Sequence, residues 1–211
     1  MGVLETATGT FLLLIAVQAY QAGATDKAMI AAGANVGLLL TPLVVQAVER
    51  RRIRISHGAA AIAALGTVAF LIAAIFPTLS IYVLAAVFGA ACLSALTPLV
   101  IQVYQDNYPA AQRGHLFSRT TVIRVAAAAV FAELAGRLLT TNIELFRWLL
   151  LFFAAAFALA ALLLRRIPSQ PLTQLESRNP MRGLRYLRED RVFRMTMMVW
   201  MLMGFANLMM T

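Results

Sequence analysis

The sequence predicts an all-α protein that crosses a membrane several times, and three observations support this. Of its 211 residues, 61% are hydrophobic and 13% are charged, whereas soluble domains average about 45–50% and about 25%. No charged residue occurs in the 51 positions from 55 to 105, enough for two crossings of about 20 residues each. The net charge of +9 comes from 18 cationic residues that are unevenly placed. These features exclude a soluble globular domain and argue against a nucleic-acid-binding protein.

Apolar stretches separated by polar or proline-containing breaks predict seven spans. In order, they are residues 4–23, 28–48, 58–76, 80–104, 119–139, 147–164 and 194–211. The first five breaks are short and rich in turn residues or arginine; they lie at 23–26, 49–57, 77–80, 105–118 and 140–144. The first span is expected to be retained, because a signal peptide needs Lys or Arg before it and this chain has Glu5 there.

The sixth break is longer and basic, and it sets the expected domain organisation. Residues 1–164 are predicted to form a six-helix transmembrane bundle. Residues 165–193 are predicted to form a cytoplasmic linker, and residues 194–211 the start of a seventh helix.

The distribution of cationic residues predicts the orientation of the chain. Fourteen of the 18 lie in the loops after the second, fourth and sixth spans. The opposite loops hold Lys27 and Arg147, and Arg124 and Arg137 fall inside the fifth span. Basic loops stay in the cytoplasm, so we expect a cytoplasmic N-terminus in a multi-pass protein of a bacterial-type inner membrane.

Polar side chains are unevenly shared among the spans. The third and sixth spans are almost free of them, which favours contact with lipid, whereas the first, second, fourth and fifth are expected to surround an interior. This order reads as two triplets, a 3+3 repeat common in secondary transporters. The candidates for a substrate cavity are Gln18, Gln21, Asn35, Ser94, Thr97 and Glu133. Gln18 and Gln21 are expected to share one helix face, either to bind solute or to tie neighbouring helices together.

The fifth span carries three charges, which predict two ion pairs. Glu133 and Arg137 are four residues apart and therefore lie on one helix face. Arg124 lies on the opposite side and is expected to pair with Glu5. Glu133 has a functional interpretation, as a proton carrier or as the counter-charge of a cationic solute. It also has a structural one, in which it only neutralises Arg137. The sequence leaves both interpretations open.

Catalytic and metal-binding patterns are missing from the sequence. There is no H-E-x-x-H, G-x-S-x-G or phosphate-binding glycine loop, and His57 and His115 have no ligand partners at suitable spacing. We therefore expect neither an enzyme nor a cofactor nor a metal site.

Three short motifs, in order along the chain, resemble the major facilitator superfamily. Residues 49–54, Glu-Arg-Arg-Arg-Ile-Arg, lie where that family has G-x-x-x-D-R-x-G-R-R between its second and third spans. Glu49 stands for the Asp and Arg50 and Arg54 for basic residues, while Val45 and Arg52 replace the glycines. Residues 108–118 are similar to the family's loop after the fourth span, and 186–194 to the segment that leads into the seventh.

The resemblance implies a secondary-active or facilitative transporter that moves a small solute, with or without a coupled ion, by alternating access. It also implies that Glu49, Arg50 and Arg54 form cytoplasmic ion pairs that favour one state. Since the family has two six-helix halves, the chain is expected to be a fragment, inactive without its C-terminal half. Two departures, Ala85 in place of an arginine and 125–130 in place of a Gly-Pro motif, argue against a proton-driven drug antiporter.

A second class of function remains open from the sequence. The arginines between 178 and 194 form a polybasic segment that would bind the anionic surface of the lipid bilayer in a membrane scaffold or assembly protein. The other interpretation of these arginines is a topology signal only.

Overall fold

The computed structural model describes residues 2–171 and 188–209. The chain forms two compact units, residues 1–172 and 173–211, and each is described by itself. Within the described residues all regular structure is helical, apart from one isolated bridge between Arg54 and Pro171. The predicted all-α class is therefore confirmed.

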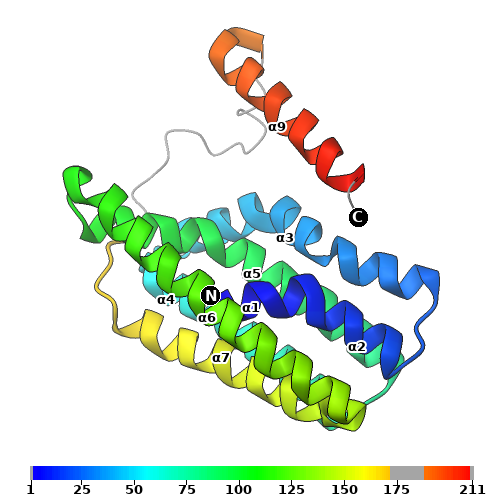
Figure 1. Cartoon of the computed structure of the whole chain (residues 1–211). Helices are drawn as coiled ribbons and strands as arrows, with labels where there is room; N and C mark the ends of the chain where they lie inside the picture. Colours follow the sequence, from blue (N-terminus) through cyan, green and yellow to red (C-terminus); the bar gives the residue numbers. More distant parts are fainter. Residues whose placement is uncertain (1, 172–187, 210–211) are drawn as a thin grey trace. The chain divides into compact units, whose positions relative to one another are not determined.

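The first unit contains the helices of the predicted six-helix bundle (Figure 1). They are α1 (Gly2–Thr6), the π-helical η1 (Ala7–Phe11), α2 (Leu12–Gln18), α3 (Ala24–Arg50), α4 (Ile55–Ile75), α5 (Leu79–Asn107), α6 (Ala110–Thr141), the short η2 (Ile143–Leu145) and α7 (Phe146–Arg166). The second unit contains α9 (Arg191–Met209), which begins with Asp190 accepting hydrogen bonds from the amides of Val192 and Phe193 at 2.8 and 3.2 Å.

Four helical segments have the length and apolar composition that a membrane crossing requires: α3, α4, α5 and the continuous η2–α7 segment. The stretch from α1 to α2 is shorter, at Gly2–Gln18. Helix α6 is long enough but carries Arg124, Glu133 and Arg137 along its length. The apolar helices support a multi-pass membrane protein.

The first predicted span ends earlier than the sequence suggested. The helix stops at Gln18, Gln21 adopts a left-handed backbone with φ of 49°, and the Ala22 amide donates to the Ala16 carbonyl at 2.9 Å. Gln18 and Gln21 therefore do not share a helix face, and that expectation was wrong. A tight turn is needed here because the next helix starts at once, with Asp26 accepting from the Gly23 amide at 3.3 Å.

The predicted loop at 105–118 is almost entirely helical. Helix α5 continues to Asn107 and α6 begins at Ala110, directly after Pro109. Arg113 makes this short turn possible, because its guanidinium donates to the carbonyls of Tyr108 and Gln105 at 2.7 and 2.8 Å. These bonds satisfy carbonyl groups that the end of a helix leaves unpaired. The polar composition of 105–118 suggested a loop, but the Arg113 hydrogen bonds stabilise the end of α5 and allow the next helix to begin after two intervening residues.

The packing of the helices supports the predicted 3+3 repeat. Helix α4 packs against α7, α3 packs against α5, and α1 packs against α6. If the first triplet (α1–α2, α3, α4) is exchanged with the second (α5, α6, α7), the α3–α5 contact maps onto the α1–α6 contact and the α4–α7 contact maps onto itself. The α4–α5 contact departs from this symmetry, because its counterpart between α7 and α1 is much smaller. Figure 1 shows α1 and α2 between α3 and α6.

The interior of the bundle is apolar and closely packed. The rings of Phe70 and Phe157 stack with centroids 5.8 Å apart, and Phe153 packs edge-on against Phe70 at 5.7 Å. The Tyr82 hydroxyl donates to the Leu12 carbonyl at 2.6 Å. Within the described part of the chain, the buried set contains one polar side chain outside the aromatic residues and Cys92, that of Ser56. That core is filled with aromatic and aliphatic side chains, and Gln18, Asn35 and Glu133 are exposed outside it. That the polar residues of four helices surround a solute-containing interior stays a prediction.

Helices α3 and α5 approach closely through small residues. A side chain at Gly33 would meet the backbone of Val87 at 3.0 Å, and one at Gly37 would collide with the backbone of Ala91. The Thr41 hydroxyl donates to the Gly37 carbonyl at 2.9 Å and so stays within its own helix. This small-residue stripe therefore serves packing.

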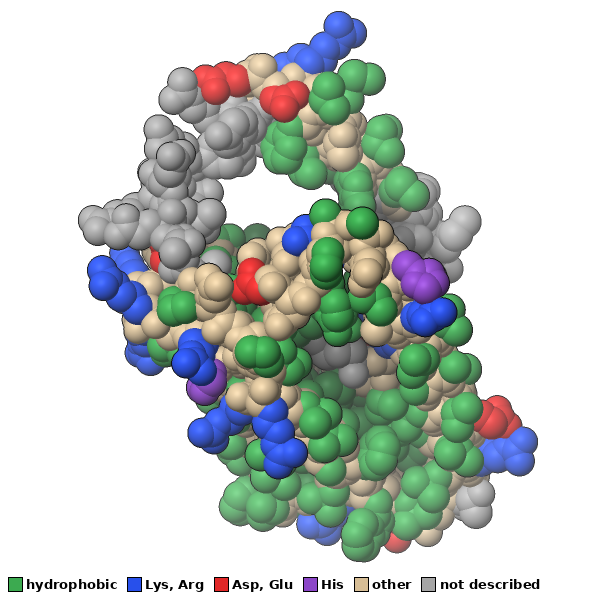
Figure 2. Space-filling model, turned by 90° about the vertical axis from the view of Figure 1, so that its left-hand side faces the viewer, with side chains coloured by type: hydrophobic (Ala, Val, Ile, Leu, Met, Phe, Trp, Pro, Cys, Tyr) green, Lys and Arg blue, Asp and Glu red, His purple; other side chains and the backbone are tan. Residues whose placement is uncertain are grey.

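One end of the bundle gathers most of its arginines. The Ser56 amide at the start of α4 donates to Ser169 Oγ at 2.9 Å, and Asn107 at the end of α5 donates to the Pro168 carbonyl at 3.0 Å. These contacts bring the arginine-bearing segments 50–54 and 165–166 to the same end, and Figure 2 shows Lys and Arg side chains around it. At the opposite end, Arg147 donates to the Ala74 carbonyl.

Candidate functional site

A cavity of about 370 Å³ lies between α1, α5 and α6. Its wall is mostly apolar, formed by Val3, Val100, Ile101, Ile123 and Ala127 together with the rings of Tyr104 and Phe117. Its polar lining residues are Glu5, Thr97, Thr120, Thr121 and Arg124. Apolar walls with a few converging polar groups are typical of small-molecule sites, and the volume falls within their range of about 300–1,000 Å³.

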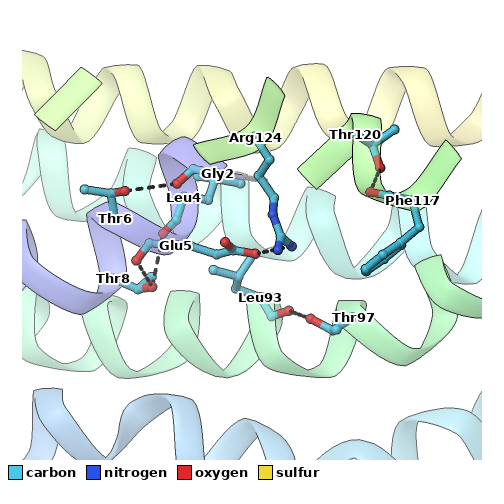
Figure 3. Close-up of polar contacts among 10 residues, drawn as sticks. All are labelled: Gly2, Leu4, Glu5, Thr6, Thr8, Leu93, Thr97, Phe117, Thr120 and Arg124. Atoms are coloured by element: carbon cyan, nitrogen blue, oxygen red, sulfur yellow. Dashed lines mark hydrogen bonds and ion pairs between the residues drawn. The ribbon is translucent and has the colours of Figure 1, made fainter. Parts of the chain in front are cut away.

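An ion pair joins α1 to α6 in the cavity wall. Arg124 Nη1 lies 3.0 Å from Glu5 Oε1, and the two side chains are 38% and 48% exposed (Figure 3). Arg124 Nε is buried and has no hydrogen-bond partner. The pair can form because α1 lies very close to α6: a side chain at Gly2 would collide with the backbone carbonyl of Arg124. The expected Glu5–Arg124 pair is thus present.

Threonine hydroxyls add hydrogen-bond acceptors to the cavity. Thr97 Oγ1 donates to the Leu93 carbonyl at 3.2 Å, and Thr120 Oγ1 donates to the Phe117 carbonyl at 2.9 Å (Figure 3). Because each hydroxyl hydrogen is directed to its own helix, the oxygen lone pairs remain available to a ligand.

The rings of Tyr104 and Phe117 lie close together in the cavity lining. Their centroids are 6.4 Å apart in an edge-to-face arrangement. Tyr104 is near the end of α5 and Phe117 near the start of α6, so this aromatic pair lies toward the arginine-rich end.

The π-helical segment η1 interrupts the first span next to Glu5. The Thr8 hydroxyl donates to the carbonyls of Leu4 and Glu5 at 3.0 and 3.2 Å. A side chain at Gly9 would meet nothing within 4 Å, so this part of the helix borders open space. Single π-turns inside α-helices are frequent at functional sites.

The structure places one of the six predicted cavity residues, Thr97, in this cavity. Gln18 is exposed at the end of α2, and Gln21 is exposed in the turn that follows. Asn35 is exposed on α3, two residues from the Gly33 and Gly37 positions that face α5, and hence on the opposite side of the helix. Ser94 is half-buried against Gly37.

Glu133, the sixth candidate, lies on the outer surface of α6. Its carboxylate is 2.6 Å from Arg137 Nη2, with side chains 63% and 78% exposed for Glu133 and Arg137. The buried face of α6 carries Phe131, Ala135 and Leu139, and Glu133 projects away from it. The Glu133–Arg137 pair predicted from the sequence is present, outside the cavity.

The motif residues between α3 and α4 form a tight turn. Glu49 is half-buried, Arg50 and Arg54 are exposed, and Arg52 has a left-handed backbone with φ of 50°. Within the part of the chain that the structure describes, no ion pair joins Glu49 to either arginine.

One lining residue of α6, Phe117, was missed because 105–118 was interpreted as a loop, whereas Thr120 and Ala127 lie inside the predicted fifth span and were not singled out there. Phe117, Thr120, Arg124 and Ala127 follow one another at intervals of three or four, the spacing of a single helix face. Extending the helical period back to Pro109 would have added Phe117 to the face that Arg124 already marked. The π-turn has no comparable signal beyond its Thr-Gly-Thr sequence.

No group of three His, Cys, Asp or Glu side chains that could hold a metal ion occurs among residues 2–171 and 188–209. Cys92 is buried on α5.

The comparisons with known proteins identify the family. The family model described as Major Facilitator Superfamily matches residues 1–211. No curated protein matches the chain. The chain therefore belongs to the major facilitator superfamily, and so to a class of multi-pass membrane proteins that transport small solutes.

Proposed function

We propose that this protein takes part in solute transport by alternating access, with the α1–α5–α6 cavity as its contribution to the solute site. The observation that carries the proposal is the Glu5–Arg124 pair in the wall of a 370 Å³ cavity. Charged groups within a membrane bundle are costly unless they face protein or water, and they commonly mark solute or ion pathways.

The polar surface of this bundle suggests that a second six-helix bundle completes the site. Gln18, Asn35 and Glu133 are exposed around a dry core, and α3 exposes Leu38, Leu39 and Leu43 as well. Family members place two six-helix halves around a midplane site. We propose that the second bundle covers part of this surface, that the chain alone gives no flux, and that its substrate is a small molecule with or without a coupled ion.

The arginine-rich end is proposed to face the cytoplasm of a bacterial-type inner membrane. Arg50 and Arg54 are exposed there, so they are available for ion pairs with the second bundle that favour one state of the cycle. The alternative of a membrane scaffold rests on the segment from 178 to 194, and its residues up to 187 lie outside the described part of the chain.

Sided labelling of single cysteines tests the proposal. Cys92 is the single cysteine, so Cys92→Ser gives a clean background for Thr97→Cys and Thr120→Cys, with Leu65→Cys on the exposed apolar face of α4 as the control. In oriented membrane vesicles, an impermeant thiol reagent should modify positions 97 and 120 from one side and leave position 65 unmodified. Equal modification at all three positions would contradict an aqueous pathway through this cavity.

Reconstitution tests the need for a second bundle. Liposomes that contain this chain alone should retain a mixture of small polar solutes as well as empty liposomes do. A leak that Arg124→Gln abolishes would show that the chain suffices, and would overturn that part of the proposal.

A further inference from the structure

The charges that line the α1–α5–α6 cavity cancel. Glu5 and Arg124 are the two charged residues of its lining, one of each sign. They form a single-contact pair, Arg124 Nη1 to Glu5 Oε1 at 3.0 Å. The cavity therefore offers one anionic and one cationic group next to each other, with no net charge.

This balance discriminates between classes of solute. A monovalent anion that took Arg124 would leave the Glu5 carboxylate without its counter-charge beside an apolar wall, and a monovalent cation would do the same to Arg124. Because the two side chains are 38% and 48% exposed, water offsets part of this cost, but a charge beside an apolar wall is still more stable with a partner than without one. A zwitterion supplies a counter-charge to each partner, so both remain neutralised when the solute binds.

Both partners also keep hydrogen-bonding capacity for such a solute. A guanidinium has five N–H donors; one joins Glu5, and Nε has no partner. A carboxylate accepts through both oxygens, and the contact with Arg124 uses Oε1. The Thr97 and Thr120 hydroxyls donate to helix carbonyls, so their oxygens are acceptors that suit an ammonium group.

The remaining wall suits a short apolar group. Val100, Ile101 and Ile123 line the cavity beside the charged pair. An aliphatic side chain placed there would be removed from water, which favours binding.

We propose that this cavity binds a zwitterionic solute with neighbouring ammonium and carboxylate groups and an apolar side chain, that is, an apolar α-amino acid. The proposal rests on the function proposed above and names its substrate class. The ammonium group lies against Glu5 and the threonine oxygens, the carboxylate against the Arg124 guanidinium, and the side chain against the aliphatic wall.

Competition binding with three matched probes tests the proposal. Radiolabelled L-leucine is bound to the purified full chain in detergent, and displaced by unlabelled L-leucine, by 4-methylpentanoate, which lacks the ammonium group, or by 3-methylbutylamine, which lacks the carboxylate. We expect unlabelled leucine to compete at least about tenfold better than either analogue. An analogue that competes as well as leucine overturns the proposal, and so does the absence of any leucine binding.

Charge-removing variants locate the binding. Glu5→Gln and Arg124→Gln should each weaken leucine binding by about tenfold or more. The matched controls Asp106→Asn on α5 and Arg119→Gln on α6, exposed residues outside the cavity lining, should bind like the wild type. Equal losses in the controls contradict the proposal.

Two further measurements keep the result decisive. If a charge variant does not fold, Thr97→Val, which keeps the ion pair and removes an acceptor, should still weaken leucine binding, and unchanged binding would count against the site.

Cysteine labelling at position 97 does not depend on leucine. If labelling shows an aqueous cavity and leucine does not bind, the substrate class is wrong and the transport proposal stands. If leucine binds and the labelling is not sided, the binding site is supported and the transport pathway is wrong.

Discussion

The α4–α7 contact and the α1–α5–α6 cavity show two opposite uses of helix packing in one bundle. In the first, a side chain at Gly66 would meet the Phe157 ring at 2.7 Å, and the buried rings of Phe70 and Phe153 fill the remaining space. In the second, three helices leave about 370 Å³ open beside a pair of charges. The α4–α7 contact is thus dry and closely packed, whereas the charged pair lies where α1 touches α6 beside an open cavity.

Removing a core ring should give the largest effect. Phe157 is fully buried and Phe117, in the cavity lining, is 50% exposed. Phe157→Ala should destabilise the bundle by about 3–5 kcal/mol because it leaves a void among close-packed side chains. Phe117→Ala should cost less than about 1 kcal/mol, because half of its ring is already exposed. Thermal or denaturant unfolding in detergent measures both; equal losses would contradict the contrast.

Enlarging a glycine should separate closed from open helix contacts. Gly37→Leu forces a side chain into the backbone of α5 and should destabilise the protein by about 1–3 kcal/mol. Gly9→Leu projects into open space and should have a much smaller effect. The difference between the two midpoints of unfolding is the readout, and a larger shift for Gly9→Leu would show that η1 is packed.

Removing the Tyr82 hydroxyl should give a moderate effect. Its bond to the Leu12 carbonyl, 2.6 Å long, ties α5 to the start of α2 within the core. Tyr82→Phe keeps the ring and should cost about 0.5–1.5 kcal/mol, the usual net value of such a bond. Tyr104→Phe, in the cavity lining, is the control and should leave the unfolding midpoint unchanged.

The exposed ion pair should matter least. Glu133 and Arg137 are 63% and 78% exposed, and exposed pairs contribute about 0–1 kcal/mol. Glu133→Gln should therefore leave unfolding almost unchanged. Solute flux should also be measured with Glu133→Gln in a transporter that contains both six-helix bundles. Unchanged flux with unchanged pH dependence would assign Glu133 a structural role only, whereas loss of the pH dependence would show that its carboxylate takes part in transport.

The sequence predicted the helices well because long apolar runs and basic breaks are local signals. Both ion pairs were also predictable, Glu133–Arg137 from its four-residue spacing and Glu5–Arg124 from the few charges present. The cavity was not, because it depends on how α1 approaches α6 through Gly2. Gln21 and Asn35 were predicted to line the cavity and do not. Gln21 lies in a left-handed turn, and Asn35 lies on the side of α3 opposite to the glycines that pack against α5. Neither feature can be predicted from composition.

The most direct test compares two cysteines on the same helix. The native Cys92 of α5 is 6% exposed within the core, while Thr97, five residues further along, is exposed at the cavity. A small, water-soluble thiol reagent should react much faster with Thr97→Cys in the Cys92→Ser background than with Cys92 of the wild-type chain. Equal rates at the two positions would contradict the account of a dry core beside an open, polar cavity.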